Sequence, residues 1–438
     1  MTPPAKDRDM DQPAQNPSTF DHVVVMVDVY APTMRLAQGF LDAGAVCVRV
    51  QSTPEAPPVY RAPFPVGQFR DNIVHHGDFE ATLRAVAAHD PAVVITGGES
   101  GVELADRLSE ALGLATNGTA LSTARRDKYL QIEAVKAAGL RGARQLLATD
   151  ADQLADWHRQ IGGQVVVKPI RSAGNDGVTF CTTPNRSAAA FGTVAAATNI
   201  FAHRNEAVVA QEFLHGTEYV VNTVSRDGRH RATDVWRYTK LSANGVSERI
   251  SGAVSVPPDD RHRDELVAYG FAVLDALGVR HGPAHLEIML TPDGPCLVEA
   301  GIRLCGADTA YYAELVTGES QVLRTVQAYL RPEEFLATHD EPHHVERHAA
   351  MAFLTSPVEG ILRSYPLLKH VEALPSFHNL QFAVKPGQFL PRTVDDSSEP
   401  MLIGLTHRVA AVVARDLNTV NYLDGHGFYD LEPDRSST

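Results

Sequence analysis

Cysteines and long apolar runs are both scarce in this sequence, which narrows the classes of protein to which it can belong. The four cysteines, Cys47, Cys181, Cys296 and Cys305, are widely scattered, and no two of them form a CxxC pair. Buried or bystander thiols in a reducing cytosol are therefore expected. No stretch is apolar and long enough to span a bilayer, so no membrane partner is expected.

Basic residues are fewer than acidic ones. The chain has 39 Lys and Arg against 53 Asp and Glu, which gives its 438 residues a formal net charge of −14. A broad surface for nucleic acid is not expected at that charge. Residues 1–19 are rich in Pro, Asp and Gln and lack an apolar core, which predicts a disordered tail rather than a signal peptide. Together these features predict a cytoplasmic protein.

Three widespread motifs are also missing. Neither GxxxxGK[ST] nor GxGxxG occurs, which excludes a P-loop and a Rossmann fingerprint. The loop at 97–101, GGESG, is not a nucleophile elbow, because GxSxG would require a glycine at Val102. A serine hydrolase built on this loop is therefore rejected.

Strands and helices alternate in the first part of the chain. This alternation predicts a parallel sheet with helices on its faces. Ligands of such sheets bind at the carboxyl ends of the strands, which is where the loop at 97–101 lies. The expected strands are 22–27, 45–50 and 92–96, and the expected helices are 33–43, 79–89 and 102–112.

The pattern is mixed further along the chain. A helical stretch at 122–138 stops at a glycine, and an α+β region follows at about 141–202. The segment from about 206 to 330 is rich in strands and ends in helices. Residues 331–346 are polar and have the composition of a linker, and 347–423 alternate short strands with Pro and Gly turns.

Residues 285–306, HLEIMLTPDGPCLVEAGIRLCG, carry the clearest chemical signal. A turn joins two strand-like runs, each with one acidic residue, Glu287 and Glu299, so the two carboxylates are expected to approach each other across a hairpin. Carboxylates on apolar strands require a cation, and hard oxygen ligands suit Mg²⁺ that holds a nucleotide's phosphates. The alternative is an exposed hairpin with two solvated acids. His285 shares the face of Glu287 and is expected to support it rather than bind metal.

A lysine and a glycine loop suggest a cradle for phosphates. Lys168 ends the buried strand VVVKP, where it needs an anionic partner or a route to water. Gly174 and Gly177 in the next loop permit unusual backbone angles and a close approach of amide N–H groups to phosphates. The alternative is a surface lysine beside a flexible turn.

A further strand, at 208–214, is followed by HGTEY. The end of such a strand offers backbone N–H and C=O groups to the edge of an adenine ring, and Glu218 is then placed to accept hydrogen bonds from ribose hydroxyls. The alternative is an ordinary hairpin turn at Gly216. The residues at the strand end are Gln211, Glu212, Phe213 and Leu214.

The order of these features resembles the ATP-grasp superfamily. The resemblance covers about 121–306 and implies an α/β fold with an N-terminal parallel-sheet domain, a lid domain and a C-terminal nucleotide-binding domain. It also implies that Lys128 and Lys168 hold phosphates, that the glycine loop covers them, and that Glu287 and Glu299 bind Mg²⁺ or Mn²⁺. The implied divisions are 1–19 (tail), 20–120 (N-terminal α/β domain), 121–205 (lid), 206–425 (C-terminal domain with a terminal α+β subdomain) and 426–438 (tail).

Within the superfamily, residues 299–306, EAGIRLCG, look like the EVGARxxG variant of bacterial L-amino-acid ligases. That likeness implies that Arg303 and the Gly306 N–H stabilise a tetrahedral intermediate. One position departs from the commoner pattern, because Gly301 stands where many members have an asparagine as a third metal ligand. The departure argues against the D-alanine ligase and carbamoyl-phosphate patterns.

The resemblance implies an ADP-forming ligase that joins two amino acids through an acyl phosphate to give a dipeptide. The expected partners are ATP and two amino-acid substrates, and a homodimer is common among relatives. One alternative keeps the chemistry but uses a non-proteinogenic acid in specialised metabolism. The others are an ATP-grasp carboxylase, for which no biotin-carrier-like segment is seen, and a regulatory nucleotide-binding module without turnover.

Overall fold

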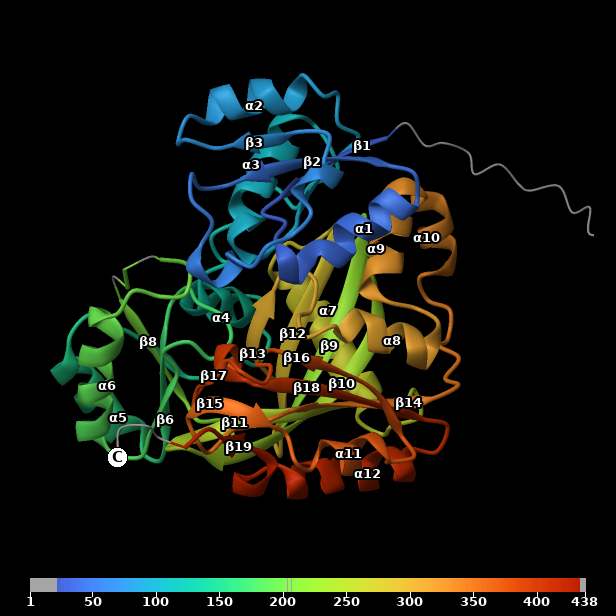
Figure 1. Cartoon of the computed structure of the whole chain (residues 1–438). Helices are drawn as coiled ribbons and strands as arrows, with labels where there is room; N and C mark the ends of the chain where they lie inside the picture. The colour runs from blue at the N-terminus through green and yellow to red at the C-terminus, as the bar shows by residue number, and fades with distance from the viewer. Residues whose placement is uncertain (1–21, 203, 206, 434–438) are drawn as a thin grey trace, which may run out of the picture.

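The computed structural model describes residues 22–202, 204–205 and 207–433, which form four sheets and the helices that cover them. The predicted N-terminal tail lies outside the described residues. A small α/β unit stands above a large antiparallel sheet, and a second small sheet lies beside it (Figure 1). None of the helices in the described ranges combines the length and the apolar character that crossing a bilayer requires. Short 3-10 helices lie at Ala31–Thr33, Pro58–Tyr60, Val66–Gln68, Glu99–Gly101, Asp396–Ser398 and His426–Phe428.

The N-terminal unit is the predicted parallel sheet, with strand order β3-β2-β1-β4. Side chains of β1 alternate between two cores, because successive residues of a strand point to opposite faces. Val24 and Met26 pack with α1, and Val25 and Val27 pack with α2 and α3. The elements are β1 (Val23–Val27), α1 (Met34–Asp42), β2 (Val46–Gln51), β3 (Asn72–Val74), α2 (Phe79–Ala87), β4 (Val93–Thr96) and α3 (Val102–Ala111).

The second unit is an antiparallel sheet with strand order β5-β8-β6-β7, and α5 and α6 cover one face of it. We call it the lid sheet. Strand β8 pairs with β6 along its whole length, so the lid boundary expected at residue 205 is wrong and falls after β8. The elements are β5 (Gln145–Ala148), α5 (Ala151–Ile161), β6 (Val165–Pro169), β7 (Thr179–Cys181), α6 (Pro184–Ala196) and β8 (Val208–Glu212).

The largest unit is an eight-stranded antiparallel sheet with order β13-β12-β9-β10-β11-β14-β18-β16. Helices α4 and α7 pack on one face of β9, β12 and β13 through an apolar core that includes Ile132, Leu266 and Leu286. The strands are β9 (Thr217–Arg226), β10 (Arg229–Ala243), β11 (Val246–Ser255), β12 (Gly282–Thr291), β13 (Gly294–Gly301), β14 (His348–Phe353), β16 (Phe377–Phe382) and β18 (Met401–His407), with α4 (Lys128–Ala137) and α7 (Arg263–Ala276).

Helix α4 begins later than the stretch at 122–138 predicts. The carboxylate of Asp127 accepts hydrogen bonds from the N–H groups of Tyr129 at 2.9 Å and Leu130 at 3.0 Å, and this N-cap starts the helix at Lys128. The residues before it form turns. Because α4 packs in the core of the large sheet, it belongs with that sheet rather than with the lid.

Three helices follow β13, and one of them corrects a prediction. Residues 331–346 were expected to be a linker, but α10 lies within them and its Phe335 is fully buried against Val224 and Ala328. The helix begins at a proline, which suits the first turn, where no N–H partner is required. The helices are α8 (Thr309–Thr317), α9 (Gln321–Leu330) and α10 (Pro332–Thr338).

The end of the described chain returns to the protein core. Phe428 is fully buried in the cluster that holds β18 and α12, and β19 pairs with β15. The predicted tail at 426–438 is therefore wrong for 426–433, because an aromatic side chain anchors this segment. The remaining elements are β15 (Gly360–Ser364), α11 (Leu368–Glu372), β17 (Phe389–Leu390), α12 (Ala410–Leu423) and β19 (Asp430–Leu431).

The anchoring role of Phe428 is open to test. Phe428→Ala should lower the free energy of unfolding by about 3–5 kcal/mol, because it removes a fully buried ring. Phe389→Ala is the matched control, since Phe389 is 60% exposed, and it should change stability by less than about 1 kcal/mol. Urea unfolding followed by circular dichroism measures both variants. Equal small losses would show that residues 426–433 are peripheral.

Candidate active site

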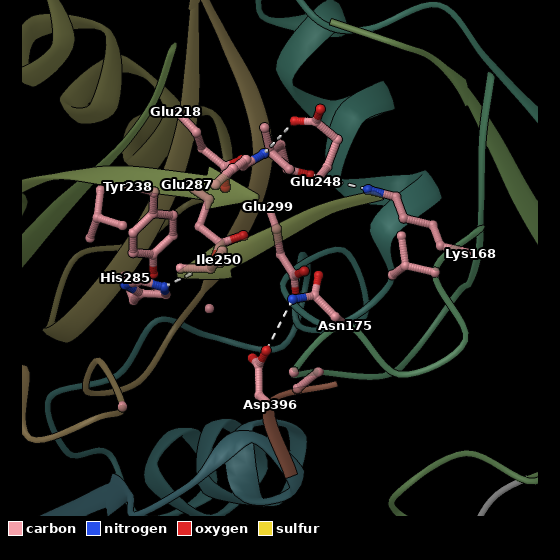
Figure 2. A pocket seen from close by; sticks show the side chains of 18 of the residues that line it. Lys168, Asn175, Glu218, Tyr238, Glu248, Ile250, His285, Glu287, Glu299 and Asp396 are labelled. Atoms are coloured by element: carbon pink, nitrogen blue, oxygen red, sulfur yellow. Dashed lines mark hydrogen bonds and ion pairs between the residues drawn. The ribbon is translucent and has the colours of Figure 1, made fainter. Parts of the chain in front are cut away.

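The predicted site residues come together in one cavity of about 500 Å³. The lid sheet lines one side of it, and a face of the large sheet lines the other (Figure 2). Gly177 is the exception and does not line the cavity. The predicted residues that do are Lys128, Lys168, Gly174, Gln211, Glu212, Phe213, Leu214, Glu218, Glu287, Glu299, Arg303 and Gly306.

The two predicted metal ligands face each other. Glu287 of β12 and Glu299 of β13 are direct cross-strand partners, as the hairpin pattern predicts. His285 Nε2 lies 3.3 Å from Glu287 Oε1, and its Nδ1 lies 2.9 Å from Asn222 Oδ1, so this histidine supports Glu287 as expected. Although burial lowers the pKa of His285, Cys305 and Glu287 together raise it to about 10.

This donor set fits Mg²⁺. Glu287 and Glu299 offer hard carboxylate oxygens on the same wall of the cavity, which is the ligand chemistry that Mg²⁺ prefers. Within the described part of the chain, no three His, Cys, Asp or Glu side chains converge to hold a metal. Phosphate oxygens and water are therefore expected to complete the coordination, as is usual for this ion.

Two lysines bring positive charge to the carboxylates. Lys128 Nζ lies 2.8 Å from Glu299 Oε1 and donates to the carbonyl oxygen of Ser172 at 2.5 Å. Lys168 Nζ reaches from the lid to the carbonyl oxygen of Val298, 3.4 Å away. Burial and, second, the charge of Lys128 lower the pKa of Lys168 to about 8. An anion bound between them would relieve this repulsion.

The glycine loop lines the cavity. Gly174 has a φ of +64° and Asn175 a φ of +61°, so the backbone turns through the left-handed region where glycine is favoured. Asn175 Nδ2 donates to Asp396 Oδ1 at 3.2 Å, which joins the lid to the 3-10 helix Asp396–Ser398 that precedes β18 (Figure 2). Gly177 has a different role, because a Cβ there would lie 2.9 Å from Cγ of Pro169. Because glycine has no Cβ, the end of the loop can pack directly against Pro169 of β6.

The strand end that was expected to bind adenine offers fewer groups than predicted. The N–H groups of Glu212 and Phe213 already donate to the carbonyls of Arg144, at 2.9 Å, and Gln164, at 3.0 Å. The Glu212 carboxylate accepts from Arg144 Nε at 2.7 Å. Among the described residues, the Leu214 N–H donates to no backbone carbonyl. This N–H and the carbonyl groups of the segment are therefore the groups that could hydrogen-bond to the edge of an adenine ring.

Sequence reasoning missed the partner of Glu218. Lys240 Nζ lies 2.5 Å from Glu218 Oε2 and 3.7 Å from Glu248 Oε2. Burial lowers the pKa of Lys240, but Glu218 outweighs burial and raises it, so the ammonium group stays charged. Lys240 follows an irregularity in the pairing of β10 with β11, and no local pattern in the sequence marks its contact with Glu218.

Arg303 is held by a residue of the N-terminal unit. Its Nε donates to Glu99 Oε2 at 3.0 Å, and Arg126 binds the other oxygen of the same carboxylate. Burial raises the pKa of Glu99, but Arg126 and Arg303 outweigh it and lower the pKa to about 2. The loop at 97–101 thus reaches the site, as its place at the carboxyl ends of the strands predicts. The ion pair with Arg303 was not foreseen.

The same ion pair occupies the space beside Gly301. A Cβ at this position would lie 3.2 Å from Cζ of Arg303 and 3.3 Å from Oε2 of Glu99. A side chain at this position would therefore require the Arg303–Glu99 pair to shift by a few tenths of an ångström, and glycine leaves the pair in place.

The chain is similar to known proteins over most of its length. Residues 161–310 match the ATP-grasp domain. The sequence is 33% identical over 390 residues to dapdiamide A synthase from Enterobacter agglomerans, an alignment that covers 87% of this chain and 91% of that protein.

Solved structures resemble it as well. An L-amino acid ligase from Bacillus licheniformis superposes with a TM-score of 0.73 at 17% identity, covering 94% of this chain and 99% of the other. The biotin carboxylase domain of the Hydrogenobacter thermophilus 2-oxoglutarate carboxylase, solved with MgADP, gives 0.64 at 12% identity, covering 94% and 90%. At these identities the likeness establishes the fold alone.

Lysines and a pair of carboxylates share one cavity with the glycine loop, and members of the ATP-grasp family use ATP with Mg²⁺. The chain belongs to the ATP-grasp family and is an ADP-forming carboxylate–amine ligase. The predicted fold class is confirmed.

The depressed pKa of Lys168 makes a pH-dependent prediction. Lys168 is charged below about pH 8 and neutral above it. The dissociation constant of ATP should therefore rise about tenfold between pH 7 and pH 9, since only the charged form attracts phosphate oxygens. Calorimetric titration with MgATP measures it. Lys168→Arg should remove this dependence, because a guanidinium group stays protonated throughout. If the dissociation constant of ATP for the wild type were equally independent of pH, Lys168 would not be a residue that binds the phosphates.

Proposed function

We propose that this enzyme joins the carboxylate of one small molecule to the amine of an amino acid through an acyl phosphate, giving an amide, ADP and phosphate. We further propose that at least one of the two substrates is a non-proteinogenic building block of a specialised metabolite. The observation that carries the proposal is a single cavity with Lys128, Lys168, Glu287 and Glu299 at one end and Arg303 beside them.

The choice of substrate class is supported by the sequence likeness. The 33% identity extends over 87% of this chain, and the relative bears the name of a diamide product. A plain dipeptide from two proteinogenic amino acids has less support, because the likeness to the L-amino acid ligase is one of fold at 17% identity. The same holds for a carboxylase at 12% identity.

The proposed chemistry begins with activation of the carboxylate. A carboxylate is a poor acyl donor, and transfer of the γ-phosphoryl group turns one of its oxygens into part of a good leaving group. Lys128 and Lys168 would orient the phosphates and offset their charge. Glu287 and Glu299 would hold Mg²⁺, which supplies further charge compensation at the phosphate oxygens.

The second step is attack by the amine. A tetrahedral oxyanion forms at the acyl carbon, and phosphate then leaves. The guanidinium group of Arg303 and the N–H of Gly306 line the cavity and would stabilise that oxyanion. Glu99 would act as a positioning residue, since it fixes the guanidinium plane.

The lid sheet has the task of excluding water. An acyl phosphate exposed to solvent is hydrolysed, so the glycine loop must cover it until the amine arrives. Asn175 of this loop donates a hydrogen bond to Asp396, which also lines the cavity, and this contact would favour the covered state. We place the reaction in the cytoplasm, where ATP is available. A homodimer stays a prediction.

The acyl phosphate can be detected by isotope transfer. With ¹⁸O in the donor carboxylate, one labelled oxygen should appear in the released phosphate for each amide bond formed. The reason is that a carboxylate oxygen departs with the phosphoryl group. Mass spectrometry of the phosphate measures it. Unlabelled phosphate, or AMP as the nucleotide product, would overturn the proposed mechanism.

Arg303 should matter after phosphoryl transfer. In Arg303→Ala, ADP release with the donor alone should persist, while the rate of amide formation falls by about 100-fold or more, as for loss of an oxyanion donor. Coupled ADP and product assays measure the two steps. Arg159→Ala is the control, because Arg159 is an exposed arginine of the lid, and it should leave both steps unchanged. A normal amide yield from Arg303→Ala would remove the role given to this residue.

A further inference from the structure

The cavity has a second end that the nucleotide motifs do not use. It is formed by side chains of β10, β11, β14 and β18, whereas Lys168 belongs to β6 and Lys128 to α4. Figure 2 shows Tyr238 and His285 on one side of the cavity and Lys168 on the other. We call this end the apolar subsite. Its side chains are Tyr238, Ile250, Ala253, Met351, Phe353 and Leu402.

The subsite is a continuous patch on one face of the large sheet. Tyr238 is the cross-strand partner of Ala253, and Ala253 is the partner of Met351. Phe353 and Leu402 are paired on the next two strands. Four adjacent strands therefore contribute mainly apolar side chains to the same part of the cavity.

The side chains of the subsite differ in how much surface they offer. Ala253 and Met351 are each 1% exposed and form the floor. Tyr238, Ile250 and Leu402 are half-buried and form the walls. A ligand group that enters the subsite is thus bounded by aliphatic side chains and by the rings of Tyr238 and Phe353.

Two polar side chains beside the subsite are hydrogen-bonded to their neighbours. Trp236 Nε1 donates to Asp234 Oδ1 at 2.6 Å, so its indole ring is what it presents to the cavity. The carboxylate of Glu399 accepts from Arg249 at 2.7 Å. The six side chains of the apolar subsite carry no charge, and the hydroxyl of Tyr238 is the polar group among them, so the subsite itself offers no ion to compensate a charge brought into it.

We propose that the apolar subsite binds the uncharged aliphatic or aromatic side chain of one of the two joined substrates, which makes that substrate an apolar amino acid. This inference rests on the proposed function, since it names the substrate class of the same cavity. A charged side chain would lose its hydration without a partner. Each methylene that fits such a pocket is worth about 10- to 200-fold in selectivity.

Binding of free amino acids tests the inference without turnover. The protein is titrated with glycine, L-alanine, L-valine, L-leucine, L-phenylalanine, L-aspartate and L-lysine in the presence of Mg²⁺ and a non-hydrolysable ATP analogue. We expect leucine or phenylalanine to bind about tenfold or more tightly than alanine. Aspartate and lysine should bind at least about tenfold more weakly than leucine or phenylalanine. Binding of aspartate or lysine as tight as that of leucine would overturn the inference, and so would failure of every member to bind.

Two variants of the subsite walls test whether the apolar subsite determines the preference for apolar amino acids. Ile250→Phe narrows the subsite and should shift the preferred ligand toward alanine or glycine. Leu402→Ala widens it and should favour phenylalanine. Both should bind the ATP analogue as the wild type does. Leu323→Ala is the matched control, because this leucine is 46% exposed on α9, and it should keep the wild-type order. An unchanged order in both wall variants, with melting temperatures near that of the wild type, would overturn the inference.

The same experiment separates this inference from the proposed function. If apolar amino acids bind selectively but no mixture of substrates releases ADP, the proposed function fails and the subsite stands. If ADP is released with amino acids of every kind alike, the function stands and the subsite fails. Fragmentation of the product by mass spectrometry then shows whether the apolar residue lies on the acyl side or the amine side of the new bond.

Discussion

The carboxylate of Glu99 is the contact on which the arrangement of the active site depends. It comes from the N-terminal unit and binds Arg126, which precedes α4, and Arg303, which follows β13. A buried carboxylate is costly without compensation. Here the two guanidinium groups outweigh burial and lower its pKa to about 2, so it stays ionised throughout the neutral range. Without it, the guanidinium groups of Arg126 and Arg303 would lose the anion that they share.

This constraint also decides the composition of the metal site. The Glu99–Arg303 ion pair fills the space into which a side chain at Gly301 would extend, within 3.2–3.3 Å of an added Cβ. A third oxygen ligand at that position would therefore crowd the clamped arginine. With glycine there, compensation of phosphate charge in the proposed mechanism would fall more heavily on Lys128 and Lys168. The depressed pKa of Lys168 is the cost of holding two such cations together in a buried place.

The parts of the site that follow from short-range rules could be predicted from the sequence. Glu287 and Glu299 are paired because a hairpin brings its two strands into register. Lys168 lies at the end of a buried strand, and the glycine loop turns where Gly174 permits it. Contacts between residues that are far apart in the sequence were not predicted. The ion pair of Lys240 with Glu218 joins β10 to β9, and Phe428 is buried by elements far from it in the sequence.

The same distinction explains why the nucleotide end of the cavity can be recognised from the sequence and the substrate end cannot. Phosphates require charges and tight turns, and these stand out as residue types at fixed spacings. A pocket for an apolar side chain is built from residues such as Ile250, Met351 and Leu402, which look like any core positions of an antiparallel sheet. Whether such a side chain packs against a neighbour or lines a cavity depends on what the opposite layer leaves open. The identity of the substrate is thus encoded in the shape of a space between layers, and no single segment of the chain specifies it.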